Sequence, residues 1–287
     1  MSYQSRDITV IIKLADDDFG KGNNELKVDG LRVETQINQE GGTSGTTMYA
    51  KIYGMKEADM LKCCTYAQDF LRIKSIEVTI LAGDSISGMS QIFQGTITDG
   101  AIEYNETPSV PLVIQCRTGY LQQLYPVPPN SAAGRMDAKS MIKSLAEGAG
   151  FSFVGDGVTA GLQNHYSYGS AIQQIKDIAR ATGIGLDISN GVVRIWPSGQ
   201  YADDHMVELS PSKGLIGYPT PIATGFIVNA EFTPDMSRGR KCRLTSSIAR
   251  ATGDFFIQNV THIISSQNPG GPWMTTAHLT ANPTVGV

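Results

Sequence analysis

The sequence is poor in charge and contains no long apolar run. Charged residues make up 17% of the chain and the formal net charge is −4, so it has no basic surplus of the kind that neutralises nucleic-acid phosphates. No apolar stretch is long enough to cross a bilayer, and we expect no membrane span. The first residues, from Met1 to Asp7, lack the apolar core of a signal peptide, which predicts synthesis and initial residence in a cytosol.

Cysteine is also scarce. The four cysteines show no CxxC or zinc-ligand spacing; they are Cys63, Cys64, Cys116 and Cys242. In a cytosol, such residues are buried thiols far more often than disulfides or metal ligands. We therefore predict buried thiols and no metal site.

Known catalytic motifs are missing. The four histidines are scattered, and the chain has neither an HExxH metal motif nor a Gly-x-Ser-x-Gly elbow. Three acidic groups each allow a chemical and a non-chemical interpretation. Asp16–Asp18 could be a cation site or a solvated loop, and Asp203–His205 could be a metal site or a polar linker. Asp99, Glu103 and Glu106 could be the paired acids of a glycosidase or a polar strand end. We favour the non-chemical interpretation of each. The prediction is no catalytic, cofactor-binding or metal-ligating residue, no cofactor and no enzyme activity.

One basic cluster is present, formed by Arg238, Arg240, Lys241 and Arg243. Neighbouring like charges suit a solvated hairpin tip, and they also suit a docking contact with an acidic partner. We favour the solvated tip. Trp273, which follows Pro-Gly-Gly-Pro, is expected to plug the interior of a barrel rather than to bind a ligand.

Glycine, Thr, Ser, Ile and Val are abundant, a mix that suits a β-rich protein with many turns. Apolar and polar residues alternate in short segments up to about residue 120, which predicts β-strands. These segments are Asp7–Leu14, Leu31–Ile37, Thr47–Tyr53, Ile76–Ile80, Ile92–Thr98 and Val110–Cys116. A helix is predicted over Lys56–Tyr66, with Ala58, Leu61 and Cys64 facing inward. A closed or nearly closed barrel would hide the edges of so many short strands.

A proline-rich linker over Leu121–Asn130 leads into a duplicated unit. Ile142–Phe153 lines up with Ile175–Leu186, and each copy predicts an amphipathic helix, a glycine stop and a short apolar strand. In the first helix the expected buried stripe is Ala138, Met141, Ile142 and Leu145.

Capping residues support both helices. Asp137 is the predicted N-cap of the first, and Ser170 with Gln173 forms a capping-box pattern for the second. Gly183 is a predicted left-handed stop. Asn190-Gly191 between two apolar runs predicts a β-hairpin with a type I′ turn.

The chain returns to β after Met206. Strands are expected over Phe226–Phe232, Asp254–Ser265 and Trp273–Thr280, whereas Gly214–Gly225, rich in Gly, Pro and Thr, is expected to be a long loop. The predicted fold class is therefore mainly β with an α+β insert: two β-barrel domains separated by a small duplicated helix–strand module. The expected domains are residues 1–125, 126–204 and 205–287.

Four segments, taken in their order along the chain, carry a family resemblance. They are Met48–Met55 running into the helix with Asp59–Leu61, Ala82–Asp84 followed by Gln91–Ile97, Leu215–Pro221, and His262–Gln267 leading to Pro269–Trp273. Together with the barrel, α/β, barrel layout, they resemble the hub protein of bacteriophage contractile-tail baseplates, whose two barrels are similar to the tail tube. The duplicated module is also similar to the small repeat domains of ring-forming secretion proteins.

The resemblance implies a structural virion protein. It would be a homotrimer that presents six similar tube-type barrels, caps a six-fold tail tube on one side and a three-fold spike on the other, and lines a channel that DNA passes without specific binding. The implied partners are other copies of the chain, the tail tube protein, the central spike protein, the wedge proteins and the tape measure. The implied location is the tail baseplate of a virion assembled in the cytoplasm of a bacterial host.

Three alternatives remain open: a tail-associated cell-wall or polysaccharide hydrolase, a secretion-system spike-like protein, and a plain binding module. The hydrolase would depend on Asp99 and Glu103. A spike protein is expected to carry a β-helical extension, and the sequence shows no such repeat. Loops at Gly41–Gly45 and Gly214–Gly225 are the expected inter-subunit contacts.

Overall fold

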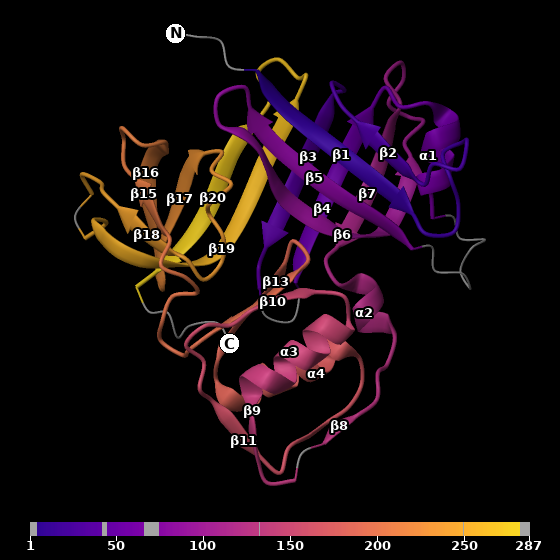
Figure 1. Cartoon of the computed structure of the whole chain (residues 1–287). Coiled ribbons are helices and arrows are strands. Elements are labelled where there is room, and N and C mark those ends of the chain that lie inside the picture. Colours follow the sequence, from indigo (N-terminus) through magenta and orange to yellow (C-terminus); the bar gives the residue numbers. More distant parts are fainter. Residues whose placement is uncertain (1–4, 42–44, 66–74, 132, 249, 282–287) are drawn as a thin grey trace. The chain divides into compact units, whose positions relative to one another are not determined.

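A computed structural model describes residues 5–41, 45–65, 75–131, 133–248 and 250–281. The chain is mainly β, with an α/β insert (Figure 1), as the sequence predicts. It divides into two compact units. Unit 1 comprises Met1–Asn38, Thr47–Thr118 and His262–Trp273, and unit 2 comprises Gln39–Thr46, Gly119–Thr261 and Met274–Val287.

Unit 1 is a sheet of antiparallel strands with one short helix. Its elements are β1 (Arg6–Leu14), β2 (Glu25–Val28), β3 (Val33–Gln39), β4 (Thr46–Tyr53), α1 (Glu57–Cys63), β5 (Ile76–Asp84), β6 (Gly88–Ile102) and β7 (Pro111–Arg117). The strands lie in the order β3-β4-β7-β6-β5-β1-β2. The last part of β19 (Gly253–Ser266) lies next to β3.

Apolar and polar side chains alternate along the strands of unit 1, so the apolar ones share one buried face. Ile8, Val10, Ile12 and Leu14 of β1 are all buried, and so are Ile76, Val78 and Ile80 of β5. Burying such side chains is the main favourable contribution to folding. Figure 1 shows the strands curling around this face. All four cysteine side chains of the chain are buried, as predicted.

Helix α1 faces the sheet with residues other than those predicted. Met60, Cys63 and Cys64 are buried, whereas Ala58 is exposed and Leu61 is 43% exposed. The prediction of Ala58 and Leu61 as inward-facing is therefore wrong. The helix has only seven residues, so its inward stripe is set by where it leaves the sheet and not by its own periodicity. The predicted end of this helix, Tyr66, lies outside the described residues.

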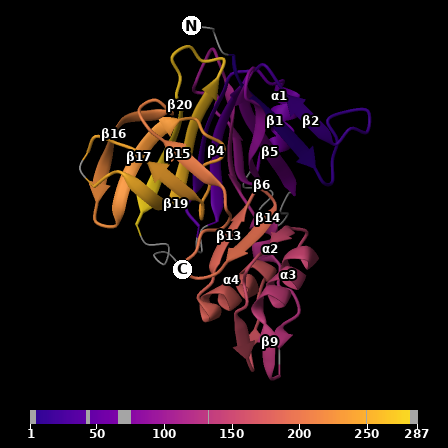
Figure 2. The same ribbon diagram turned by 60° about the vertical axis from the view of Figure 1, so that its left-hand side comes forward.

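The α/β module opens unit 2. Its elements are α2 (Tyr120–Leu124), β8 (Asn130–Ser131), β9 (Arg135–Asp137), α3 (Ala138–Gly148), β10 (Ser152–Val154), β11 (Gly161–Gln163), β12 (Tyr166–Ser167), α4 (Ala171–Thr182), β13 (Gly185–Ser189) and β14 (Val192–Trp196). A three-stranded sheet in the order β10-β14-β13 packs with α3 and α4, which lie side by side in both views (Figures 1 and 2). The predicted repeat is present: α3 leads to β10, and α4 leads to β13.

The predicted caps and turn of the module are confirmed. The Asp137 carboxylate accepts a hydrogen bond from the Ser140 amide at 3.0 Å, and the Ser170 hydroxyl accepts one from the Gln173 amide at 3.3 Å. Gly183 ends α4 in the left-handed region, with φ 66°. Asn190 and Gly191 both have positive φ, as a type I′ turn requires.

The C-terminal β part of unit 2 follows the module. Its elements are β15 (Met206–Leu209), β16 (Leu215–Ile222), β17 (Gly225–Glu231), β18 (Lys241–Leu244), β19 and β20 (Trp273–Thr280). The strand order is β16-β17-β20-β19, with β18 antiparallel to β19 and β15 parallel to β18. Val228, Ala230, Leu244 and Ile257 are buried at the centre of this part.

Residues 214–225 form a strand rather than the predicted long loop. β16 pairs with β17, with a register shift between Ile216 and Thr220. Pro219 and Pro221 are tolerated because β16 stands at the end of the strand order, where only one side of the backbone needs a partner. Trp273 is half-buried, with the Arg6 guanidinium 5.8 Å from its ring centroid, so it does not plug a barrel.

The two compact units do not follow the predicted boundaries at residues 125/126 and 204/205, because β19 contributes its first part to unit 2 and its last part to unit 1. The three-domain division stays a prediction. Within the described part of the chain, no helix is both long and apolar enough to cross a membrane.

Candidate functional site

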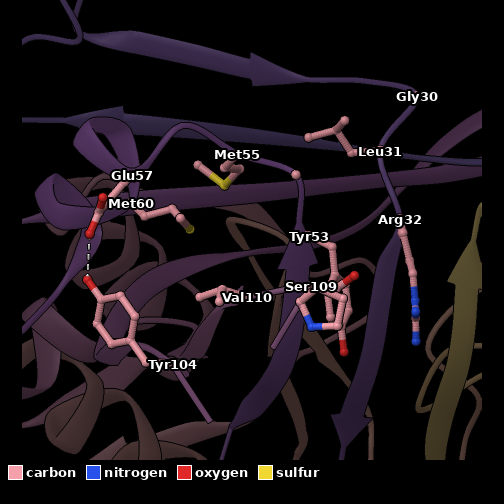
Figure 3. Close-up of a pocket in the computed structure, with 12 residues that line it drawn as sticks. Gly30, Leu31, Arg32, Tyr53, Met55, Glu57, Met60, Tyr104, Ser109 and Val110 are labelled. Atoms are coloured by element: carbon pink, nitrogen blue, oxygen red, sulfur yellow. Dashed lines mark hydrogen bonds between the residues drawn. The ribbon is translucent and has the colours of Figure 1, made fainter. Parts of the chain in front are cut away.

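A groove of about 600 Å³ opens in unit 1 beside the end of β4 (Figure 3). Leu31 and Arg32 reach it from the start of β3, Tyr53 and Met55 from the end of β4, and Met60 from α1. The loop between β6 and β7 contributes Tyr104, Pro108, Ser109 and Val110. We call this site the paired-charge groove, because its charged side chains are matched within the chain.

Arg32 lines one end of the groove, and the Lys51–Glu106 pair is linked to it through Tyr53. The Arg32 guanidinium lies 2.6 Å from the Glu34 carboxylate and 4.3 Å from the centroid of the Tyr53 ring. The Lys51 ammonium pairs with Glu106, which also accepts a hydrogen bond from the Tyr53 hydroxyl at 3.1 Å. Each cation therefore has its own carboxylate.

These pairs fix the protonation states in the groove. The hydrogen bond from Lys51 lowers the pKa of Glu106, and the same bond raises the pKa of Lys51. Burial, together with the hydrogen bond to Glu106, raises the pKa of Tyr53. At the far end, the hydrogen bond to Glu57 at 2.8 Å raises the pKa of Tyr104 (Figure 3). Each shift moves the pKa of its group further from pH 7, so these groups are poorly suited to proton transfer.

The apolar lining decides what such a groove can bind. Leu31, Met55, Met60 and Val110 supply aliphatic and thioether surface, and methionine adapts readily to different partner shapes. With Arg32 paired to Glu34 and Glu57 hydrogen-bonded to Tyr104, the groove suits an uncharged, apolar segment better than an anion or a nucleic acid.

The carboxylates considered for glycoside hydrolysis are held by separate local contacts. Asp99 accepts a hydrogen bond from the Thr65 hydroxyl at 3.2 Å, and Glu103 accepts from the backbone and side chain of Asn105 at 3.2 and 2.9 Å. Glu106 belongs to the ion pair with Lys51. The structure thus gives each carboxylate a structural partner of its own.

The two candidate metal sites consist of turn and linker contacts. Asp203 accepts from the His205 amide at 3.2 Å and pairs with Arg240 at 2.9 Å. Asp18 accepts from the Gly20 amide at 2.7 Å, within the predicted polar loop. Among the described residues, no group of three or more His, Cys, Asp or Glu side chains is placed to hold a metal ion.

The basic cluster is not the solvated hairpin tip that the sequence favours. Arg238 is only 5% exposed and donates a hydrogen bond to the Leu186 carbonyl. Arg240 pairs with Asp203, while Lys241 and Arg243 lie 2.6 and 2.7 Å from Asp254. The solvated-tip prediction is wrong because each cation has a partner within the chain, whereas the docking contact stays a prediction.

Exposed apolar side chains form a second surface, on β16. Tyr218 is 71% exposed and Ile216 is 44% exposed, at the end of the strand order. Large exposed apolar groups on an edge strand are typical of interaction surfaces. From the sequence, these residues were expected in a loop. The aromatic and aliphatic side chains among the glycines and prolines were the pattern that could have indicated a strand.

Solved structures of tail proteins share this fold over almost the whole of both chains. The tail protein from Neisseria meningitidis MC58 is 12% identical with a TM-score of 0.59, covering 95% of this chain and 96% of that chain. The 43 kDa tail protein of prophage MuSo2 from Shewanella oneidensis is 9% identical with a TM-score of 0.59 and the same coverage. At such identities the likeness is one of fold.

A further match is to the Francisella PdpA–VgrG complex, half-lidded, with 11% identity and a TM-score of 0.58. It covers 99% of this chain but 59% of that chain. No curated protein sequence matches the chain.

The fold is therefore that of β-rich phage tail proteins. Residues 60–277, well over half of the chain, match the family described as baseplate hub gp41, and the chain belongs to that family. The chain is a structural component of the virion tail baseplate, which confirms the resemblance seen in the sequence.

Proposed function

We propose that the chain is the central hub of the baseplate, where it joins a six-fold tail tube to a three-fold spike and acts by assembly rather than catalysis. The observation that carries the proposal is the extent of the family match, because residues 60–277 include strands of both β parts and the whole α/β module. The match therefore supports a role for most of the chain, from α1 to β20, and not for one small fragment of it.

Symmetry gives a physical reason for two β parts in one polypeptide. Three copies of the chain present six β parts around one axis, so a single trimer meets a six-fold tube on one side and a three-fold spike on the other. The proposed partners are other copies of the chain, the tail tube and spike proteins, the wedge proteins and the tape measure.

The charge of the chain suits a channel for DNA. Its net charge of −4 and the internal pairing of the basic cluster leave little to hold phosphates, so DNA would pass without specific binding. In this proposal the β parts line that channel, as the barrels of tube proteins would.

Two surfaces are proposed as contacts in the assembly. One is the paired-charge groove, which suits an apolar segment, and the other is the β16 surface with Ile216 and Tyr218. The expected contact at Gly41–Gly45 falls partly on residues 42–44, which lie outside the described residues.

Light scattering on the purified protein at several concentrations tests the proposal. We expect the mass of a trimer, and we expect the double variant Ile216→Thr/Tyr218→Thr to need a higher concentration to form it. Ile86→Thr is the matched control, since Ile86 is 67% exposed on the turn between β5 and β6. An unmodified chain that stays a monomer, and that also fails to bind its tail tube and spike proteins, would overturn the proposal.

The fold likeness to the Francisella complex favours a second candidate, a secretion-system spike-like protein. Mass spectrometry of purified phage particles distinguishes the two. The hub proposal predicts the chain in intact virion tails at a fixed ratio to tube protein, and its absence from tails would favour the second candidate.

A further inference from the structure

The segment Arg238–Arg240 contacts both the module and the C-terminal β part within unit 2. We propose that Arg238 is a positioning residue that clamps the β13–β14 hairpin of the module to the C-terminal β part and so fixes the orientation of the module. This clamp is an internal device of unit 2 and does not depend on which partner the baseplate supplies. We call the contacts of Arg238 and Gly239 the Arg238 junction.

Arg238 holds both strands of the hairpin. Its guanidinium donates to the carbonyl of Leu186 on β13, and it lies 5.8 Å from the ring centroid of Trp196 on β14. Gly185 pairs with Trp196 across the hairpin, and a Cβ there would fall 2.1 Å from the indole ring. Asp187, also on β13, is buried, and its charge acts on Arg238.

The same segment is bonded to the C-terminal β part. The Gly239 amide donates to the Ile257 carbonyl at 2.9 Å, and the Ile257 amide donates to the Arg240 carbonyl at 3.0 Å. Trp196 also packs against Phe256 of β19, with ring centroids 6.4 Å apart. Arg238 and Trp196 thus form one contact between a hairpin of the module and a strand of the C-terminal β part.

The connecting segment between the two parts is fixed at the junction as well. The Ala202 amide donates to the Gly239 carbonyl at 2.8 Å, and Asp203 pairs with Arg240. A Cβ added at Gly239 would lie 2.7 Å from the Ala202 side chain. The chain between β14 and β15 is therefore bonded to the residues that directly follow Arg238.

Burial makes Arg238 a demanding residue to replace. Burying a guanidinium is unfavourable unless hydrogen bonds compensate, and lysine does not match a planar, multiply donating group that lies over an aromatic ring. Gly41 closes over the same guanidinium, since a Cβ at Gly41 would lie 2.1 Å from Nε of Arg238. Gly41→Ala therefore disturbs the junction without changing Arg238, and it also strains the backbone at residue 41, where φ is 69°.

Hydrogen exchange followed by mass spectrometry tests the clamp on the full chain. In Arg238→Met, we expect peptides with the amides of Ala202, Gly239 and Leu186–Trp196 to exchange about tenfold faster or more. The amides of α3 and α4, around Ile142 and Ile175, should exchange as in the unmodified chain. Limited proteolysis should cut faster between Pro197 and His205.

Arg243→Met is the matched control, because Arg243 is an exposed arginine paired with Asp254 in the same cluster; it should leave these rates unchanged. Gly41→Ala should speed the same peptides as Arg238→Met, and it keeps the test valid if Arg238→Met fails to fold. Unchanged rates at the junction in Gly41→Ala and in folded Arg238→Met would overturn the proposal. So would equal loss of protection everywhere in Gly41→Ala, because Arg238 would then serve the whole fold and not the junction.

Discussion

His262 is a titratable residue that is almost wholly buried. It lies in β19 with 1% of its surface exposed, and burial lowers its pKa to about 4. An unfolded histidine has a pKa of about 6.5. Above about pH 6.5 it is neutral in both states, so its titration leaves stability unchanged there.

Below that pH the His262 side chain binds a proton in the unfolded chain but stays neutral in the folded chain. We therefore expect the free energy of unfolding to fall by about 3 kcal/mol from His262 alone between about pH 6.5 and pH 4, and to level off below. Urea unfolding of the unmodified protein and of His262→Gln across this pH range measures the change in free energy of unfolding. The variant should lose much less stability as the pH falls. His205→Gln, at a half-exposed position, is the control for the loss of a histidine as such. A His262→Gln curve parallel to the unmodified one would refute the assignment.

Residues with local partners were predictable from the sequence, and residues with distant partners were not. Asp137 and Ser170 bond to amides three positions away, so short motifs indicate them. Arg238 bonds to Leu186, 52 positions away, and nothing beside it in the sequence indicates burial. The neighbouring basic residues instead suggested solvent, because like charges in sequence are usually exposed.

Among the elements, the helices of the module form where local signals agree. Ser170 begins α4 and Gly183 ends it, and the apolar stripe between them, with Ile172, Ile175 and Ile178, is buried in the module core. The periodicity, the cap and the stop all indicate the same helix, which explains why it was predicted closely.

Ser170→Ala tests this account of α4. Losing the hydroxyl leaves the Gln173 amide without its cap, which should lower the free energy of unfolding by about 1 kcal/mol. Chemical denaturation measures the loss, and Ser144→Ala, at an exposed position within α3, should change it by less than about 0.5 kcal/mol. Equal losses of unfolding free energy in the two variants would contradict a stabilising role of the Ser170 cap.

β16 shows where prediction from local signals fails. Gly217, Pro219 and Pro221 are typical of a loop, yet the segment pairs with β17 because an edge strand requires hydrogen bonds on one side only. β2 was missed for a related reason: its four residues, Glu25–Val28, are too few to display an alternating pattern. In both cases the strand exists because of its neighbour in the sheet.

For the whole molecule, the sequence indicated the class of fold but not that one strand serves two compact units. β19 is one strand of 14 residues that serves two compact units, and its neighbours β3 and β18 come from opposite halves of the chain. These strands are far apart in the sequence, so no change in composition along the chain indicates that they pair. The groove could not be predicted from the sequence either, because it collects residues from the segment before β3, the end of β4, α1 and the loop between β6 and β7.

The central claim is that three copies of this chain form the hub between tube and spike. Electron microscopy of the protein assembled with its tail tube and spike proteins tests it most directly. The account predicts a ring of three chains with six β lobes around a central channel, tube on one face and spike on the other. A ring with another number of chains, or one β lobe per chain, would contradict it.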